Sequence, residues 1–293
     1  MSAQQAEGWT RRRFLEGLTG AGTLGLFSLH ARLVTAEPPP ETTTIRLGHS
    51  DTLCNAPQFV AEALLQSEGF TEVHHISAGP GSPTPLLASG EIHISMGLGA
   101  LQSIRIDAGD PIVILAGVHV GCYELFATER IRSVRDLKGK AVAVPALGGG
   151  AHTFLASMLA YVGLDPRQDI QWVIKPFAEA MELLAKGQID GFLGFPPEPQ
   201  ELRARRIGRV VVNTAIDRPW SQYFCCMVAG NREFIQNHPI ATKRALCAIL
   251  KATDVCALEP DRVAQLIVDK GLTPRYDYAL QTMQEIPYNR WRE

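Results

Sequence analysis

The sequence has little excess charge of either sign and no concentrated run of basic residues. Its 28 lysines and arginines are balanced by 30 aspartates and glutamates, which gives a formal net charge of −2. Nucleic-acid-binding domains carry a basic patch or stripe. The densest basic cluster here, residues 201–209, is short and typical of the solvated face of a helix. We therefore expect no nucleic-acid partner.

Cysteine is also sparse. The chain of 293 residues has six cysteines, a much lower share than in a small disulfide-stapled scaffold. Cys225 and Cys226 are neighbours, a spacing that seldom forms a disulfide. The sequence contains no Cys-x-x-Cys pair and no His/Cys group at the spacing of a structural zinc site. We expect buried free thiols, no metal site and no cofactor.

Long apolar runs are missing, including near the N-terminus. Three arginines, Arg11–Arg13, precede an uncharged stretch between Glu16 and Arg32 that glycine, serine and threonine interrupt. A membrane-spanning helix needs about 20 mostly apolar residues, so this stretch is too short and too polar to be an anchor. A charged start, a short apolar region and small residues such as Val34-Thr35-Ala36 are typical of a signal peptide.

The sequence around the arginines, Thr10–Glu16, resembles the twin-arginine export motif, a receptor-read address. We therefore predict that residues 1–36 are a signal peptide read by the twin-arginine export machinery; the alternative is an amphipathic N-terminal helix with a basic start. No cysteine precedes Cys54, so a lipoprotein anchor is not expected. These features predict a periplasmic protein that is soluble after signal removal.

An internal repeat organises the rest of the chain. Residues 86–97, LLASGEIHISMG, align without gaps with residues 183–194, LLAKGQIDGFLG. Each copy reads as a helix that ends at a glycine C-cap, Gly90 or Gly187, followed by a short strand. The elements upstream of each copy repeat at nearly the same offset, so each half reads strand, helix, strand, helix, strand. Such alternation predicts parallel sheets with right-handed crossovers.

The remaining segments suggest how the two halves are connected. Stretches rich in β-forming residues follow each copy, and after Asn231 the sequence is helical. We expect an α/β fold of two Rossmann-like lobes joined by a two-strand hinge. The predicted division is lobe 1 over residues 44–130, lobe 2 over 131–221, and a helical return to lobe 1 over 222–293.

Two segments carry a family resemblance. Residues 133–155, SVRDLKGKAVAVPALGGGAHTFL, and residues 183–202, LLAKGQIDGFLGFPPEPQEL, are similar to the nitrate/sulfonate/taurine-type substrate-binding proteins of ABC importers, a group that includes thiamine-precursor-binding proteins. The resemblance implies a periplasmic binding protein type II-like fold, a small organic or anionic solute, an ABC permease as partner, and a monomer. It also implies that the chain is C-terminally short, because family members usually carry a further helical stretch after the equivalent of Trp291.

The expected ligand site follows from the strand ends. Ligands of open α/β sheets bind outside the carboxyl ends of the strands. The candidates are the loops at those ends and residues near the hinge, and none is predicted to be catalytic. They are Ser50, Asp51, Asn55, Gly97, Gly99, His119, Gly148, Gly149, Gly150, His152, Phe195, Glu198 and Tyr223.

Some of these candidates have two interpretations. The triple glycine either brings backbone N–H groups close to an anion at a helix N-terminus or forms a plain turn. Glu198 either caps a helix or binds a cationic or amide group of the solute. Each histidine is either a ligand contact or an ordinary core or surface residue.

Three function classes remain. The first is a solute-binding protein that captures its ligand between two lobes. The second is an enzyme on the same scaffold, of the pyrimidine-precursor or menaquinone-pathway type; against it stand the export signal and the lack of a G-x-S-x-G or other nucleophile–base motif. The third is a ligand-binding sensor subunit. We predict the first.

Overall fold

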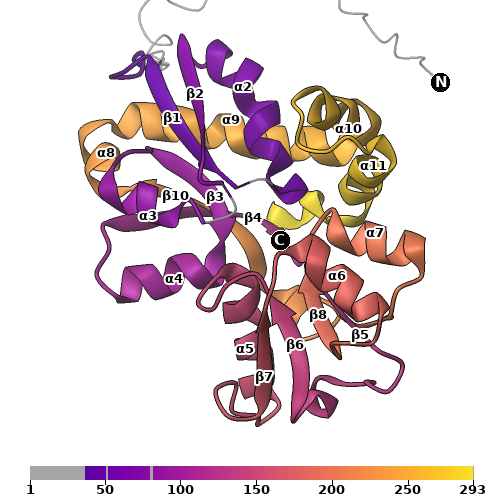
Figure 1. Cartoon of the computed structure of the whole chain (residues 1–293). Helices are drawn as coiled ribbons and strands as arrows, with labels where there is room; N and C mark the ends of the chain where they lie inside the picture. The colour runs from indigo at the N-terminus through magenta and orange to yellow at the C-terminus, as the bar shows by residue number, and fades with distance from the viewer. Residues whose placement is uncertain (1–36, 51, 80–81, 293) are drawn as a thin grey trace, which may run out of the picture. The chain divides into compact units, whose positions relative to one another are not determined.

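The computed structural model describes residues 37–50, 52–79 and 82–292 (Figure 1). The predicted signal peptide, residues 1–36, and the candidate ligand residue Asp51 lie outside these residues. The described residues from Pro39 onward belong to one compact unit, which holds all the helices and strands described below. Within the described residues, no helix combines the length and apolarity needed to cross a bilayer.

The first sheet forms the core of lobe 1. Its strands are β1 (Thr44–His49), β2 (Glu72–Ser77), β3 (Ile94–Leu98), β4 (Ile112–Val120) and β10 (Phe224–Asn231), in the order β2-β1-β3-β10-β4. β1 pairs in parallel with β2 and β3, whereas β10 pairs antiparallel with both β3 and β4. A late segment of the chain therefore fills the place between two early strands.

The second sheet repeats this arrangement in lobe 2. Its strands are β5 (Glu124–Ala127), β6 (Lys140–Val144), β7 (Ile170–Ile174), β8 (Gly191–Gly194) and β9 (Arg209–Asn213), in the order β7-β6-β8-β5-β9. β6 pairs in parallel with β7 and β8, and β5 is antiparallel to β8 and β9. In each sheet the antiparallel fourth strand directly follows a crossover from the other sheet.

The helices follow the predicted repeat. In lobe 1, η1 (Leu53–Asn55), α2 (Ala56–Ser67), α3 (Thr84–Ser89) and α4 (Gly99–Asp107) connect the strands. In lobe 2 the corresponding helices are α5 (Gly150–Tyr161), α6 (Phe177–Ala185) and α7 (Glu198–Arg205), and η2 (Val134–Leu137) precedes β6. Gly90 and Gly187, the predicted C-cap glycines, have φ of 78° and 66°. This confirms the internal repeat and the α/β class.

Two details of the sequence prediction need correction. The sheets are mixed rather than parallel, because β5 and β10 enter antiparallel after each crossover. In addition, β5 is hydrogen-bonded within the second sheet although the predicted division at residue 130 grouped it with lobe 1. The first crossover therefore falls between Val120 and Glu124. Alternating apolar strands carry no signal for the sheet that they join, so the sequence could not locate this point.

The C-terminal region is helical, as predicted, and covers lobe 1. It consists of α8 (Arg232–Asn237), α9 (Pro239–Leu258), α10 (Pro260–Asp269), α11 (Tyr276–Glu285) and η4 (Tyr288–Arg292), and η3 (Trp220–Gln222) lies in the second crossover. α9 packs on α2, and four of its alanines are fully buried at spacings of three and four residues: Ala241, Ala245, Ala248 and Ala252. Small side chains on one helix face allow this close approach.

Candidate functional site

The two crossovers between the lobes are hydrogen-bonded to each other. The backbone N–H of Tyr123, in the first crossover, donates to Oγ1 of Thr214, and the N–H of Thr214, in the second, donates to the carbonyl of Tyr123, each over 2.9 Å. Gly121 has φ of +23°, and a Cβ there would lie 2.0 Å from the Thr214 carbonyl oxygen. This contact between the crossovers therefore requires glycine at position 121.

The triple-glycine loop lies at the start of α5 and faces lobe 1. Gly150 lies close to Leu98 at the end of β3 and to the hydroxyl of Tyr123, since a Cβ at residue 150 would approach both at 3.3 Å. The N–H of Gly148 donates to Nδ1 of His152 over 3.1 Å. The His152 side chain therefore stabilises the loop through this hydrogen bond. Partial burial lowers the pKa of His152.

A second pair of candidate loops faces each other at the ends of β1 and β8. The N–H of Leu53, in lobe 1, donates to the carbonyl of Pro196, in lobe 2, over 3.4 Å. Ser50 and Asn55 flank Leu53, and Phe195 and Glu198 flank Pro196. The structure therefore brings these two predicted segments together, as it does the β3 end and the triple glycine.

Glu198 is an acid with a strongly perturbed pKa in these loops. It begins α7, and its Oε2 is buried without a hydrogen-bond partner among the described residues. Burial raises the pKa of Glu198 to about 8. The carboxyl group is thus in large part protonated at neutral pH and able to donate a hydrogen bond.

The remaining candidates lie in different surroundings. Gly97 lies against the side-chain amide of Gln102, and Gly99 against Met227. Tyr223 is 66% exposed, so it is not enclosed with the other candidates. His119 is fully buried and lies beside the thiols of Cys54, Cys122 and Cys226.

Arg203 forms a connection between lobes that the sequence analysis missed. From α7 it donates to Glu124 of β5 and, over 2.7 Å, to Oε1 of Glu285 of α11. Burial raises the pKa of Glu124, an effect that the neighbouring Arg203 opposes. A cavity of about 20 Å³, room for about one water molecule, adjoins Glu124, Gln200 and Glu285. Local sequence gives no signal for such a pairing, since its members are far apart in the chain.

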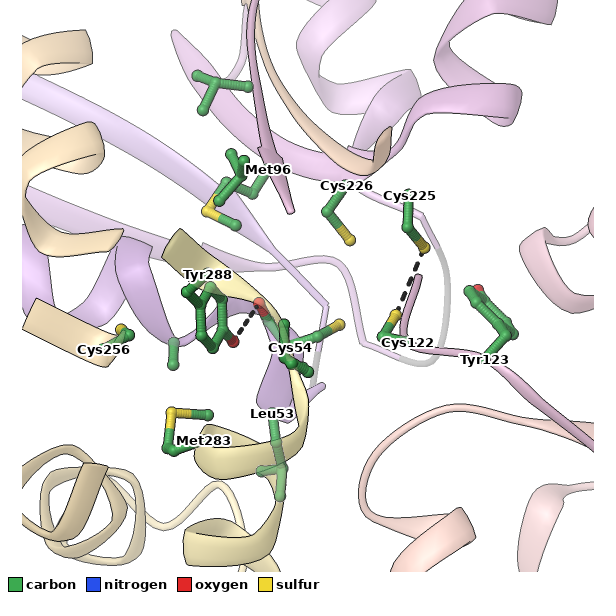
Figure 2. Packing of buried hydrophobic residues seen from close by; sticks show 14 of the residues in the cluster. Leu53, Cys54, Met96, Cys122, Tyr123, Cys225, Cys226, Cys256, Met283 and Tyr288 are labelled. Carbon is green, nitrogen blue, oxygen red and sulfur yellow. Dashed lines mark hydrogen bonds between the residues drawn. The ribbon is translucent and has the colours of Figure 1, made fainter. Parts of the chain in front are cut away.

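A cluster of thiols lies beside the first crossover (Figure 2). All six cysteines are free, and five of them are buried. Figure 2 shows the side chains of Cys54, Cys122, Cys225 and Cys226 turned toward one shared space. Among the described residues, the ligand atoms of Cys54, His119, Cys122 and Cys226 all lie within 4.8 Å of one another, which is close enough for one metal ion. No metal site was expected from the sequence, because these residues come from four separate segments.

Comparisons with known proteins agree with this architecture. None of the curated proteins compared with the chain matches it significantly in sequence. The periplasmic nitrate-binding protein NrtA from Synechocystis PCC 6803 is similar in structure, with a TM-score of 0.69 and 17% identity over 84% of this chain and 71% of that chain. The alkanesulfonate-binding protein SsuA from Xanthomonas axonopodis pv. citri, bound to MOPS, has a TM-score of 0.67 and 19% identity over 86% of both chains.

The aliphatic sulphonate-binding protein SsuA from Escherichia coli is also similar, with a TM-score of 0.66 and 19% identity over 83% of this chain and 84% of that chain. These matches confirm the predicted two-lobed fold, which the chain shares with these three binding proteins. The sequence profile of the NMT1-like family matches residues 38–268. Because this match spans most of the sequence, the chain belongs to the NMT1-like family.

Proposed function

We propose that this chain is the solute-binding component of an ABC importer, which captures a small organic or anionic solute between its lobes and delivers it to a membrane permease. The observation that carries the proposal is the pairing of loops across the lobes. Residues at the carboxyl end of β1 face those after β8, through Leu53 and Pro196, and the end of β3 faces the start of α5, through Leu98 and Gly150.

Closure of the two lobes is the proposed mechanism. The lobes are covalently joined by two crossovers, which suit a hinge motion. A solute that contacts both lobes makes all its contacts only in the closed form, and it therefore shifts the population toward closure. The loop contacts described above support this mechanism, because they join residues of both lobes. The permease would recognise the closed surface.

The chemistry of the paired loops favours an anionic group. The helices α4, α5 and α7 begin at these loops, and helix N-termini favour negative charge. An ionised Glu198 would repel an anion, but the raised pKa of about 8 leaves the carboxyl group in large part neutral at pH 7. In this form Glu198 is a hydrogen-bond donor to the anion. The raised pKa resolves the conflict between a carboxylate in the loop and an anionic solute.

A panel of solutes tests the binding function. Nitrate, taurine, longer alkanesulfonates and aromatic carboxylates would each be added to the purified protein, with the melting temperature and the radius of gyration in solution as readouts. We expect at least one class to raise the melting temperature and to compact the protein. Nuclear magnetic resonance of the recovered solute should show it unchanged. Turnover, or a complete lack of stabilisation and compaction, would contradict the proposal.

A variant of Glu198 tests the proposed chemistry of the site. With an anionic solute identified by the panel, Glu198→Gln should bind as well as the wild type at pH 7. It should also retain that affinity at pH 9, where the ionised wild-type carboxylate repels the anion. Glu179→Gln, on α6 and paired with Lys175 over 2.7 Å, is the control and should follow the wild type. Equal pH dependence in all three proteins would exclude a donor role for Glu198.

We also propose periplasmic localisation through twin-arginine export, on the pattern of residues 10–36. Replacing Arg11 and Arg12 with lysine should leave folded, ligand-competent protein in the cytoplasm, as measured by cell fractionation. Unchanged export would rule out the twin-arginine route.

A further inference from the structure

The cysteine cluster combines ligand atoms from four separate segments. Cys54 belongs to η1, His119 to β4, Cys122 to the first crossover and Cys226 to β10. All four residues are buried, and their ligand atoms lie within 4.8 Å of one another. A disulfide would use only two of the thiols and no histidine. The convergence of a third thiol and an imidazole requires another explanation.

The imidazole of His119 is oriented as a metal ligand. Its Nδ1–H donates to the carbonyl oxygen of Val120 over 3.0 Å. This hydrogen bond fixes the tautomer that leaves a lone pair on Nε2. Nε2 is buried and makes no hydrogen bond to any residue that the structure describes, although buried polar atoms nearly always have a partner. Histidine ligands of metals typically donate the other ring N–H to a carbonyl or carboxylate in this way.

The Cys54 thiol has a buried hydroxyl group beside it. Oγ1 of Thr52 lies 2.8 Å from Sγ of Cys54 and can donate a hydrogen bond to it. A thiolate formed at Cys54 on metal binding would keep this hydrogen bond. Enclosed thiolates need a positive counter-charge, which a bound metal cation supplies.

We propose that Cys54, His119, Cys122 and Cys226 bind one Zn²⁺ ion, which is held as a resident ion at the first crossover. Three thiolates and one imidazole are a ligand set of closed tetrahedral zinc sites. Zn²⁺ leaves a net charge of −1 on the filled site, whereas Cu⁺ with the same ligands would leave −2 in an enclosed position. Charge compensation therefore favours zinc, although thiolates also suit Cu⁺.

The geometry requires only a small contraction. Zn–S bonds of about 2.3 Å and a Zn–N bond of about 2.0 Å separate tetrahedral ligand atoms by roughly 3.5 to 3.8 Å. The widest separation in the cluster is at most 4.8 Å, so closure by about 1 Å suffices. The ion would tie the end of β1 to β4, β10 and the first crossover. This inference does not rest on the proposed solute-binding function, since none of its steps uses the solute.

Cys225 provides a matched control. Its Sγ lies 3.4 Å from that of Cys122, but it is not one of the four residues whose ligand atoms come together. A Cys122–Cys225 disulfide would remove one zinc ligand, so the site requires reduced Cys122. Replacing Cys225 with serine blocks this disulfide and leaves all four proposed ligands in place.

The test uses the full chain, purified in a reducing buffer. Zinc content would be measured by mass spectrometry of the element, and affinity by competition with a chromophoric chelator. We expect one Zn²⁺ per chain, and Co²⁺ added to the metal-free protein should show the absorption of tetrahedral thiolate coordination. Cys226→Ser should lower zinc affinity by at least about 100-fold. Cys225→Ser and Cys256→Ser, the second a buried thiol outside the cluster, should each retain one equivalent.

Several results would overturn the proposal. One is a chain that takes up no zinc in competition with the chelator; another is equal loss of zinc in Cys226→Ser and Cys225→Ser. Binding of Cu⁺ without Zn²⁺ would refute the assignment of the ion. If Cys226→Ser does not fold, His119→Gln replaces it, and the Co²⁺ spectrum of the wild type gives an answer without any variant. Loss of solute binding with zinc binding intact would contradict only the proposed function.

Discussion

Removal of the Arg203 side chain tests the connection between α7, β5 and α11. Arg203 donates to Glu124, which is 6% exposed, and to Glu285, whose side chain is 45% exposed. Breaking a buried ion pair costs about 3–5 kcal/mol because the remaining charge is uncompensated. The Arg203 side chain is itself 31% exposed, so solvent screens part of this loss. We expect Arg203→Ala to lower the free energy of unfolding by about 2–3 kcal/mol.

The cost of this variant should depend on pH. Burial already raises the pKa of Glu124, and without Arg203 the folded-state pKa rises further. A carboxyl group whose pKa is higher in the folded state than in the unfolded state makes the folded protein less stable as pH rises. The difference between wild type and Arg203→Ala should therefore grow from pH 5 to pH 8.

Urea unfolding at several pH values measures both effects, from the midpoint and the slope. Glu285→Gln removes only the exposed arm and should cost less than about 1 kcal/mol. The double variant Arg203→Met with Glu124→Gln removes both charges of the buried pair and should recover most of the loss. If Arg203→Ala costs no more than Glu285→Gln, or if its cost is independent of pH, the buried pair does not act as described.

Three further changes have expected outcomes. Because the pKa of Glu198 is raised to about 8, its contribution to stability should fall as pH rises from about 4.5 to 8, by at most about 1.4 kcal/mol per pH unit. Thermal unfolding of Glu198→Gln across this pH range should lack the slope. An identical slope in both proteins would refute the assignment of the raised pKa to Glu198. Gly121→Ala places a Cβ against the Thr214 carbonyl, whereas Gly109, with φ of +95°, has open space around it. Gly121→Ala should therefore cost at least about 2 kcal/mol more than Gly109→Ala in urea unfolding, and equal costs would contradict this. Tyr288→Phe removes the 3.0 Å hydrogen bond to the buried backbone carbonyl of Cys54. It should lower the free energy of unfolding by about 1–2 kcal/mol, which calorimetry would detect. An unchanged melting temperature would show that the hydroxyl contributes nothing to stability.

The internal repeat made much of the fold predictable. The gapless match of residues 86–97 with 183–194 located corresponding helices, glycine C-caps and strands, which the structure shows in the same order in both sheets. Helical periodicity after Asn231 likewise located the C-terminal helices. The return of the chain to lobe 1 near residue 222 was expected from the sequence, but two details were not. These are the antiparallel insertion of β10 between β3 and β4 and the membership of β5 in the second sheet. The partner of a strand is decided by tertiary packing and not by its own residues.

The candidate site was less accessible from sequence. The rule of strand ends selected loops that do face each other, such as those around Leu53 and Pro196. Tyr223 was selected only for its place near the hinge, and its exposure follows from side-chain packing that no local pattern reports. The cysteine cluster could not be predicted from the sequence for a further reason. Zinc-site motifs rely on ligands a few residues apart, whereas Cys54 and Cys226 meet only because β10 returns to the first sheet.

The placement of β5 in the second sheet and of β10 in the first also affects the order in which the two lobes can fold during synthesis. Every strand of the second sheet, from Glu124 to Asn213, is contiguous in the chain, whereas the first sheet waits for β10, which begins at Phe224. Domains commonly fold from the N-terminus as they emerge from the ribosome. Here the order is reversed, because lobe 2 can complete its sheet while lobe 1 still exposes the unpaired edges of β3 and β4. The lobe that is begun first is finished last.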